Sequence, residues 1–161
     1  MLRAATLDDL PQILDIYNDA VLHTTAIWND AVVDLDNRRA WFIDRQARNY
    51  PILVAEDAGK IAGYASFGDF RPFDGYRFSV EHSVYVAEPN RRHGFGRALV
   101  QGLYEPARKL RKRVMIGGIA GDNAGSLKLH ANLGFVETGR MPGVGTKFGK
   151  LLDLVFVQKE L

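Results

Sequence analysis

The most constraining feature of this chain is a short apolar run that leads through a glycine-containing loop into an amphipathic segment. Residues 84–86 are β-branched and aromatic and precede polar turn residues, which is typical of a strand. The loop carries Gly94 and Gly96, and the apolar residues after it recur at helical spacing. Unpaired amides at a helix start point outward, with the positive end of the helix dipole behind them. The segment therefore predicts a phosphate-binding loop between a strand and a helix.

Three phosphate-binding patterns compete for this loop, and single residues exclude two of them. A P-loop requires Lys followed by Ser or Thr after its second glycine, but residues 97–98 are Arg-Ala. The dinucleotide fingerprint requires a third glycine where Leu99 stands. The remaining pattern is Arg-x-x-Gly-x-Gly, formed by Arg91, Gly94 and Gly96. A glycine-containing turn without a ligand is the alternative for the loop taken alone.

The Arg-x-x-Gly-x-Gly loop resembles the coenzyme A pyrophosphate loop of the GNAT superfamily of N-acetyltransferases. Residues 123–135 resemble the second cofactor segment of that superfamily. Further segments resemble one subfamily, the phosphinothricin and methionine sulfoximine or methionine sulfone N-acetyltransferases, over nearly the whole chain. These segments are residues 16–21, 25–29, 63–69, 71–73, 80–86, 145–149 and 152–154.

Composition limits the classes of protein to which the chain can belong. A length of 161 residues suits one domain, residues 1–161, with a sizeable core. The net charge of +2 gives little reason to expect a nucleic-acid partner, and the basic run 108–113 is interpreted as a solvated helix end. Without cysteine there is no thiolate metal site and no acyl-cysteine intermediate, and we expect no metal. No apolar run reaches membrane-spanning length, so we expect a cytoplasmic protein that does not bind membranes.

Hydrophobic periodicity and turn residues predict the order β-α-α-β-β-β-α-β-α-β-β, an α+β fold with one mixed sheet and helices on both faces. A capping box at residues 6–9 opens the first helix. Pro106 predicts a kink or an early helix end near Tyr104. The glycine-rich residues 142–149 are expected to form a long connection over a site. The other expected helices are residues 36–49 and 124–133, and the strands are residues 2–5, 51–56, 61–68, 81–86, 114–119, 135–140 and 152–158.

The resemblance implies a GNAT-type acyltransferase fold in which two central strands splay apart. In the gap, the backbone of Val84, Tyr85 and Val86 would pair with the pantetheine arm of acetyl-CoA. Asn123 would bond the pantetheine through its amide, and its alternative role is a helix N-cap. The residues that would wrap the pyrophosphate are Arg92, His93, Gly94, Phe95, Gly96 and Arg97.

The implied reaction is attack of an amine on a thioester by direct transfer. Because an ammonium has no lone pair, a base must remove its proton, and Glu81 is the candidate. The alternative for Glu81 is a structural ion pair with a nearby arginine such as Arg77. His130 stands where many superfamily members have a tyrosine that protonates the departing thiolate. A core histidine without a catalytic role is the alternative for His130.

The substrate-binding residues expected from the resemblance are Arg71, Pro72, Phe73, Glu81, His82 and Ser83. Arg71 offers a bidentate fork for a substrate carboxylate or oxyanion. His82 is expected on the opposite face of its strand from Glu81, as packing or framing. Trp28 is interpreted as core or pocket wall, and Lys147 as added positive charge near an anionic ligand.

The implied function is acetyl-CoA-dependent acetylation of a small amino acid such as phosphinothricin, methionine sulfoximine or methionine sulfone, by a homodimer. The alternatives are another small amine, a protein N-terminus, or a non-catalytic acyl-CoA-binding sensor. Three positions depart from the subfamily pattern. Arg92 replaces a usual glycine, Phe70 a usual tryptophan, and residues 150–151 a usual Arg-Trp pair.

Overall fold

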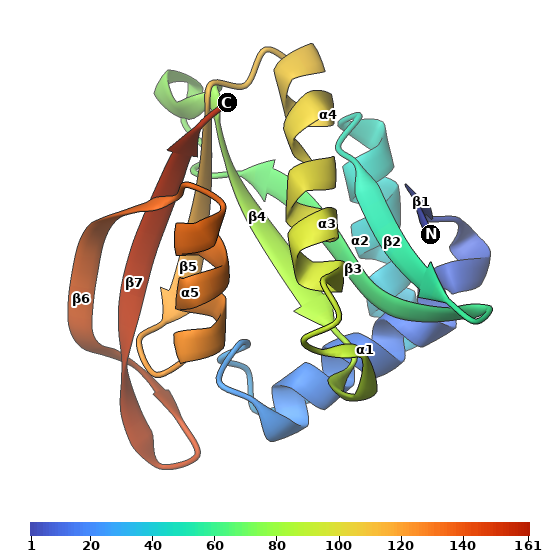
Figure 1. Ribbon diagram of the computed structural model, residues 1–161, viewed down its shortest axis with the longest axis horizontal. Coiled ribbons are helices and arrows are strands. Elements are labelled where there is room, and N and C mark those ends of the chain that lie inside the picture. The colour runs from blue at the N-terminus through green and yellow to red at the C-terminus, as the bar shows by residue number, and fades with distance from the viewer.

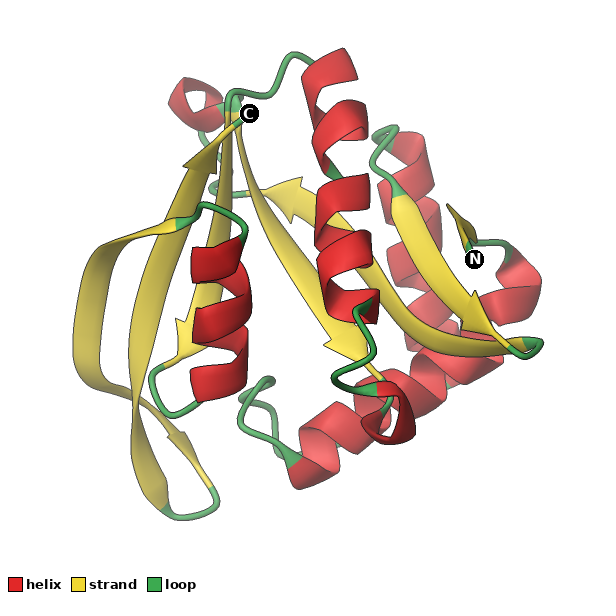
Figure 2. Cartoon of the chain, viewed as in Figure 1, coloured by secondary structure: helices red, strands yellow, loops and turns green.

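A computed structural model describes residues 1–161 as a seven-stranded mixed sheet in the order β1-β2-β3-β4-β5-β7-β6, with helices on both faces (Figures 1 and 2). The predicted order of strands and helices is confirmed. The strands are β1 (Leu2–Ala4), β2 (Ile52–Asp57), β3 (Lys60–Asp69), β4 (Ser79–Val86), β5 (Val114–Ala120), β6 (Val136–Lys147) and β7 (Lys150–Glu160). The helices are α1 (Leu10–His23), α2 (Leu35–Ala47), α3 (Phe95–Gly102), α4 (Tyr104–Lys109) and α5 (Ala124–Asn132), with short 3-10 turns at Leu7–Asp9, Asp74–Tyr76 and Glu88–Asn90.

The first helix begins as the sequence predicts. The Thr6 backbone amide donates to Asp9 Oδ2 at 2.7 Å, which forms the predicted capping box, and a 3-10 turn leads into α1. The buried face of α1 includes Leu10, Ile13 and Val21, which recur at helical spacing.

The helix that follows the glycine loop is interrupted near the predicted position. Helix α3 ends at Gly102 and α4 begins at Tyr104, with Leu103 between them. Pro106 has no N–H to donate to the carbonyl of Gly102, so one helical hydrogen bond is missing there. The predicted interruption is confirmed, and α4 continues the direction of α3 in Figure 1.

The expected long connection at residues 142–149 is wrong. Residues 145–147 pair with residues 150–152, and only Phe148 and Gly149, at φ of 52° and 71°, turn between β6 and β7. Two left-handed residues are the conformation that a tight hairpin turn requires. A register shift between Met141 and Gly145 accommodates the glycines of β6.

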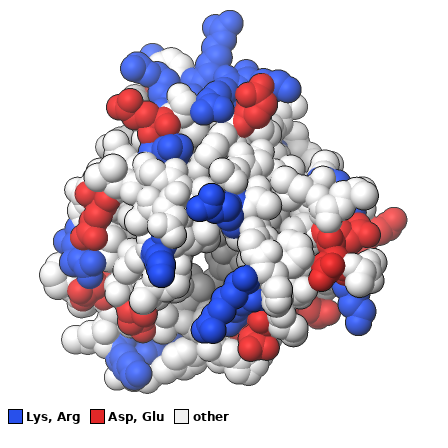
Figure 3. All heavy atoms as spheres, in the orientation of Figure 1, with Lys and Arg blue, Asp and Glu red and all other residues white.

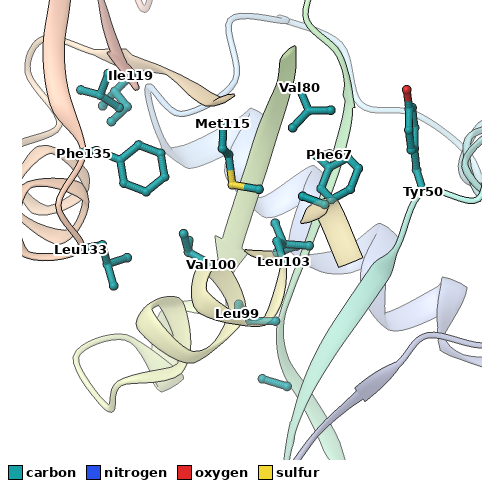
Figure 4. Packing of buried hydrophobic residues seen from close by; sticks show 14 of the residues in the cluster. Tyr50, Phe67, Val80, Leu99, Val100, Leu103, Met115, Ile119, Leu133 and Phe135 are labelled. Atoms are coloured by element: carbon teal, nitrogen blue, oxygen red, sulfur yellow. The ribbon is translucent and has the colours of Figure 1, made fainter. Parts of the chain in front are cut away.

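The main hydrophobic core lies between the sheet and the face covered by α3, α4 and α5. Figure 4 shows Leu99 and Val100 of α3 among Phe67, Val80 and Met115 of the sheet. A second core between the sheet and α1 and α2 contains Leu10, Ile13, Phe42, Val54 and Tyr64, among others. Alternate residues of β4 therefore face two different cores.

Strands β4 and β5 pair in parallel only at their beginnings. The paired residues are 79–81 of β4 and 114–116 of β5, after which the two strands diverge (Figure 1). Strand β4 remains paired with β3 as far as Val86, and β5 remains paired with β7 as far as Ala120. The sheet is thus split along one seam, and the expected splaying of the central strands is confirmed.

Candidate active site

A cleft of about 920 Å³ opens where β4 and β5 separate. Its walls are the diverging strands, the loop before α3, the beginning of α5 and the end of α1. This volume falls in the range of small-molecule sites. Figure 3 shows a hollow in this face of the molecule with Lys and Arg side chains around it. The arginines that line the cleft are Arg91, Arg92 and Arg97.

The strand edge within the cleft comes from residues 84–86. These residues pair with β3 on one side, and β5 does not reach them on the other. A free strand edge offers amides and carbonyls to an extended ligand that carries amide groups of its own. At one end of this edge, Arg91 Nε donates to the carbonyl of Val86 at 3.3 Å.

The loop before α3 is held in a conformation that suits an anion. Gly94 has a φ of 86° and caps α3, whose first residue is Phe95. A Cβ at Gly96 would lie 3.2 Å from Leu129 Cδ2, so the glycine lets α3 approach α5 closely. Arg92 has a φ of 66°, in the left-handed region that favours glycine. The amides at this helix start, with the arginines around them, fit a pyrophosphate.

Asn123 lies at the opposite wall of the cleft, before α5. Its Oδ1 accepts from the Ser126 amide at 3.1 Å, so Asn123 caps the helix as the alternative interpretation holds. Asn123 also lines the cleft. Its capping role does not use the side-chain amide nitrogen, which can donate to a ligand.

Glu81 lies at the top of the split, where β4 and β5 are still paired. Its Oε1 would be 3.0 Å from a Cβ at Gly118, so a glycine on β5 makes room for the carboxylate. Burial raises the pKa of Glu81, and the positive charge of Arg71 opposes the rise. Arg77 instead donates to the carbonyl of Asp74 and stacks on Phe78, and the expected alternative of an ion pair with Glu81 is wrong.

His82 and His130 meet on the other face of β4. Both rings are buried, their Nε2 atoms are 2.8 Å apart, and both line the cleft. His82 Nδ1 lies 2.9 Å from the carbonyl oxygen of Ile116. His130 Nδ1 lies 2.7 Å from the carbonyl oxygen of Ser126. His82 therefore lies on the face opposite Glu81, as expected, and packs against α5.

The expected substrate residues of the loop after β3 do not line the cleft. Arg71 is close enough to act on the pKa of Glu81, but its guanidinium rests on Phe70. Phe73 follows Pro72 in this loop and is 70% exposed. Ser83 lines the cleft on the same strand as Glu81.

Trp28 and Lys147 are both used for packing, which confirms the core interpretation of Trp28 and differs from the expectation for Lys147. Trp28 covers Gly145 of β6, and its ring nitrogen donates to Thr25. Lys147 is buried, and its Nζ donates to the carbonyls of Val21, Ile27 and Asn29. The expected contribution of Lys147 to the charge of the site is therefore wrong, because its ammonium is buried and donates to backbone carbonyls at the end of α1 and in the segment after it.

Sequence reasoning missed Ser126 and the residues that end α1. Thr24, Thr25 and Ala26, just after α1, line the cleft. Residues 25–26 belong to a segment that resembles the subfamily, but no role in the site was assigned to them. Ser126 is three residues after Asn123, and its hydroxyl is 3.4 Å from His130 Nδ1. The spacing of four residues between Ser126 and His130 places both on one helix face, which is the signal that was available.

A split parallel seam, a free strand edge and an anion-binding helix start together are the arrangement that the resemblance implied for an acyl-CoA-dependent transferase. Residues 2–156 match the family described as Acetyltransferase (GNAT) domain. The chain belongs to this family and is an acetyltransferase, and GNAT acetyltransferases use acetyl-CoA.

Relatives of known activity cover the whole chain. An L-methionine sulfoximine/L-methionine sulfone acetyltransferase of Salmonella typhimurium is 53% identical over 99% of this chain and 94% of its own length. A phosphinothricin N-acetyltransferase of Alcaligenes faecalis is 38% identical over 99% of this chain and 81% of its own.

Solved structures agree with this assignment. A Salmonella typhimurium acetyltransferase determined with acetyl-CoA superposes with a TM-score of 0.98 at 53% identity, covering all of this chain and 93% of the other. A ribosomal-protein-alanine N-acetyltransferase of Brucella melitensis superposes with a TM-score of 0.97 at 52% identity, covering 100% and 99% of the two chains. No helix of this structure is long and apolar enough to span a bilayer.

Proposed function

We propose that this acetyltransferase transfers the acetyl group of acetyl-CoA to the α-amino group of a small amino acid related to methionine sulfoximine, methionine sulfone or phosphinothricin. The observation that carries the proposal is Glu81, a half-buried carboxylate with no ion-pair partner at the head of the split seam. The relatives that act on such amino acids are similar over the whole length of the chain.

Glu81 is the general base in this proposal. A carboxylate removes a proton from an ammonium more readily when its own pKa lies nearer neutrality, and burial raises the pKa of Glu81 in that direction. Bound acetyl-CoA would supply the activated acetyl group. Residues 84–86 would hold its amide arm, and the backbone N–H near Val84 would face the thioester oxygen.

The remaining residues bind the ligands or return a proton. Arg92, His93, Gly94, Phe95, Gly96 and Arg97 would surround the pyrophosphate, and Asn123 would donate to the amide arm. Arg71 would pair with the substrate carboxylate, with Pro72, Phe73 and Ser83 around it. His130 would serve the departing thiolate as an acid.

A panel of amino acids with a thiol-release assay tests the proposal. We expect CoA release with methionine sulfoximine, methionine sulfone or phosphinothricin, and loss of at least about tenfold in kcat for Glu81→Gln, because a positioned base contributes about 10²–10⁴-fold. Acetyl-CoA affinity of that variant, measured by calorimetry, should be unchanged. Wild-type turnover in Glu81→Gln would remove Glu81 from the role.

A protein N-terminus is the second candidate acceptor. The Brucella structure supports it, since that protein is named for acetylation of a ribosomal-protein alanine and is 52% identical. An alanine-initiated peptide in the same assay separates the two. Turnover of the peptide without turnover of any free amino acid would overturn the small-substrate proposal. Acetyl-CoA binding without any turnover would favour a sensor.

We also propose that the active form is a homodimer. The hairpin of β6 and β7 exposes Val144, Phe148 and Leu151, and β6 is an unpaired edge of the sheet. Exposed apolar residues next to an open sheet edge are typical of an interface. Phe148 also lines the cleft, so a partner at this hairpin would border the site.

A further inference from the structure

His82 and His130 make three short polar contacts, which is one more than the protons of two neutral imidazole rings can satisfy. Three short contacts join the pair to itself and to the backbone, at 2.9 Å from Ile116 O, 2.8 Å between the Nε2 atoms and 2.7 Å from Ser126 O. Each contact needs one proton, and the carbonyl oxygens bring none. Three contacts therefore need three ring protons, whereas two neutral imidazoles carry two.

The surroundings indicate where the protons lie. Burial and the neighbouring His130 lower the pKa of His82 to about 3, so His82 is neutral. Its Nδ1 then donates to Ile116, and its Nε2 can only accept. His130 must consequently carry a proton on Nε2. The remaining nitrogen, His130 Nδ1, is the atom that gains or loses the third proton.

His130 Nδ1 has two oxygen neighbours, both from Ser126. Burial lowers the pKa of His130. When Nδ1 is protonated, it donates to the carbonyl at 2.7 Å, and this hydrogen bond opposes part of that lowering. When Nδ1 is not protonated, the Ser126 hydroxyl at 3.4 Å is the donor within reach. Ser126 lines the cleft, so its hydroxyl lies between His130 and the cleft.

No other charge competes for this proton. Glu81 lies on the opposite face of β4, with its carboxylate over Gly118. Phe135 packs on both rings, with ring centroids 5.3 Å from His82 and 5.1 Å from His130. No carboxylate or cation outside the pair contributes to the pKa of either ring.

We propose that His82 and His130 act as one proton-sharing pair, in which His82 positions His130 and the third proton leaves through the Ser126 hydroxyl to the sulfur of the departing CoA. This inference rests on the proposed function. The Ser126 O–H bond breaks as an S–H bond forms. Ser126 regains a proton from His130 Nδ1, the pair falls from three ring protons to two, and solvent in the open cleft restores the third.

The protonation pattern is measured on the free protein, without cosubstrate or turnover. With ¹⁵N-labelled histidine rings, NMR should find His82 as the neutral Nδ1–H tautomer from pH 5 to 8 (roughly two units or more above its pKa). His130 should keep Nε2–H and titrate at Nδ1. An Nε2–H tautomer of His82, or titration of His130 at Nε2, would overturn the pair whatever the substrate of the enzyme proves to be.

The outlet is tested with a matched pair of variants. Ser126→Ala should lower kcat by about tenfold or more, as expected on loss of a positioned acid, while the KM for acetyl-CoA changes little. Ser126→Thr keeps the hydroxyl and should retain most of kcat. Equal rates in Ser126→Ala and the wild type would rule out the hydroxyl route.

The positioning role of His82 is tested against packing. His82→Phe fills the space of the His82 ring but removes the Nε2 atom that accepts from His130. The variant should change the pH at which kcat falls on the basic side, and the pKa of His130 should change with it. Phe135 packs on both rings but has no exchangeable proton. Phe135→Leu should therefore lower stability and leave the basic fall of kcat at the same pH. An unmoved basic fall of kcat and an unmoved His130 titration in folded His82→Phe would contradict the proposal.

Discussion

At the scale of single residues, burial raises the pKa of Glu81 and the charge of Arg71 opposes the rise. Because the positive charge of Arg71 lowers the pKa that burial raises, Arg71→Ala should raise the pKa of Glu81 and move the acid limb of kcat/KM to higher pH. The KM for the amino acid should rise about tenfold or more, since loss of a charge-assisted hydrogen bond costs about 1.5–3 kcal/mol. Steady-state kinetics from pH 5 to 9 checks both effects.

Arg77→Ala is the matched control for this experiment. Arg77 lies in the same loop, donates to Asp74 O, and has no effect on the pKa of Glu81. It should leave the acid limb where it is. A limb that moves equally in both variants would mean that the loop, and not the charge of Arg71, controls Glu81.

The ionised carboxylate of Glu81 should lower the free energy of unfolding at neutral pH. Burial raises the pKa of Glu81, so the folded state holds its proton more tightly than the unfolded state does. That stabilisation is complete below the ordinary pKa of Glu and is lost as pH rises through the folded-state pKa. Glu81→Gln should therefore unfold at a higher urea concentration than the wild type at pH 7, and the gain should shrink toward pH 4.

Glu88→Gln, at an exposed glutamate without an ion pair, should show no such gain. A loss of stability in Glu81→Gln at pH 7 would mean that the fold itself uses the charge.

Glu81 was foreseeable from its place before the strand edge. The contact of His82 with His130 was not, because it joins residues 48 apart through the packing of α5 on the sheet.

At the scale of elements, Trp28 and Gly145 hold the segment after α1 against β6. A Cβ at Gly145 would clash with the indole ring of Trp28, so Gly145→Ala must displace the indole. We expect a loss of about 1–3 kcal/mol in the free energy of unfolding, as overpacking typically costs. Urea unfolding measures it. Gly139→Ala in the same strand, with no atom within 4 Å of its Cβ, is the control and should change little.

The interruption at Pro106 could be predicted from the sequence, but the second half of β6 could not. Pro106 interrupts its helix through covalent geometry, which any sequence displays. Residues 142–147 contain one Pro and two Gly and have little preference for strand, yet they complete β6 because residues 145–147 pair with β7. Tertiary pairing overrides local preference there, and only the structure can report it.

At the scale of the whole molecule, the split seam was expected only through the resemblance to acetyltransferases. Residues 79–86 form one regular strand in sequence, and no local pattern marks the point after Glu81 where β5 leaves β4. The cleft arises because β5 stays paired with β7 while β4 stays paired with β3. Long-range strand pairing of this kind has no signature within either strand.

The proposed dimer is also a property of the whole molecule. Leu151 is 78% exposed at the β6–β7 hairpin, near Phe148, which lines the cleft. Leu151→Glu would place a charge in the interface, and desolvating an unpaired charge is costly. Sedimentation should therefore find twice 18.0 kDa for the wild type and 18.0 kDa for Leu151→Glu.

Leu22→Glu, at a half-exposed leucine of α1, should remain dimeric. If the partner borders the site at Phe148, the monomeric Leu151→Glu variant should lose affinity for the amino acid while its affinity for acetyl-CoA is kept, because the strand edge and the glycine loop belong to one chain. A monomeric wild type would refute the dimer. A monomeric variant with an unchanged KM for the amino acid would place the interface away from the site.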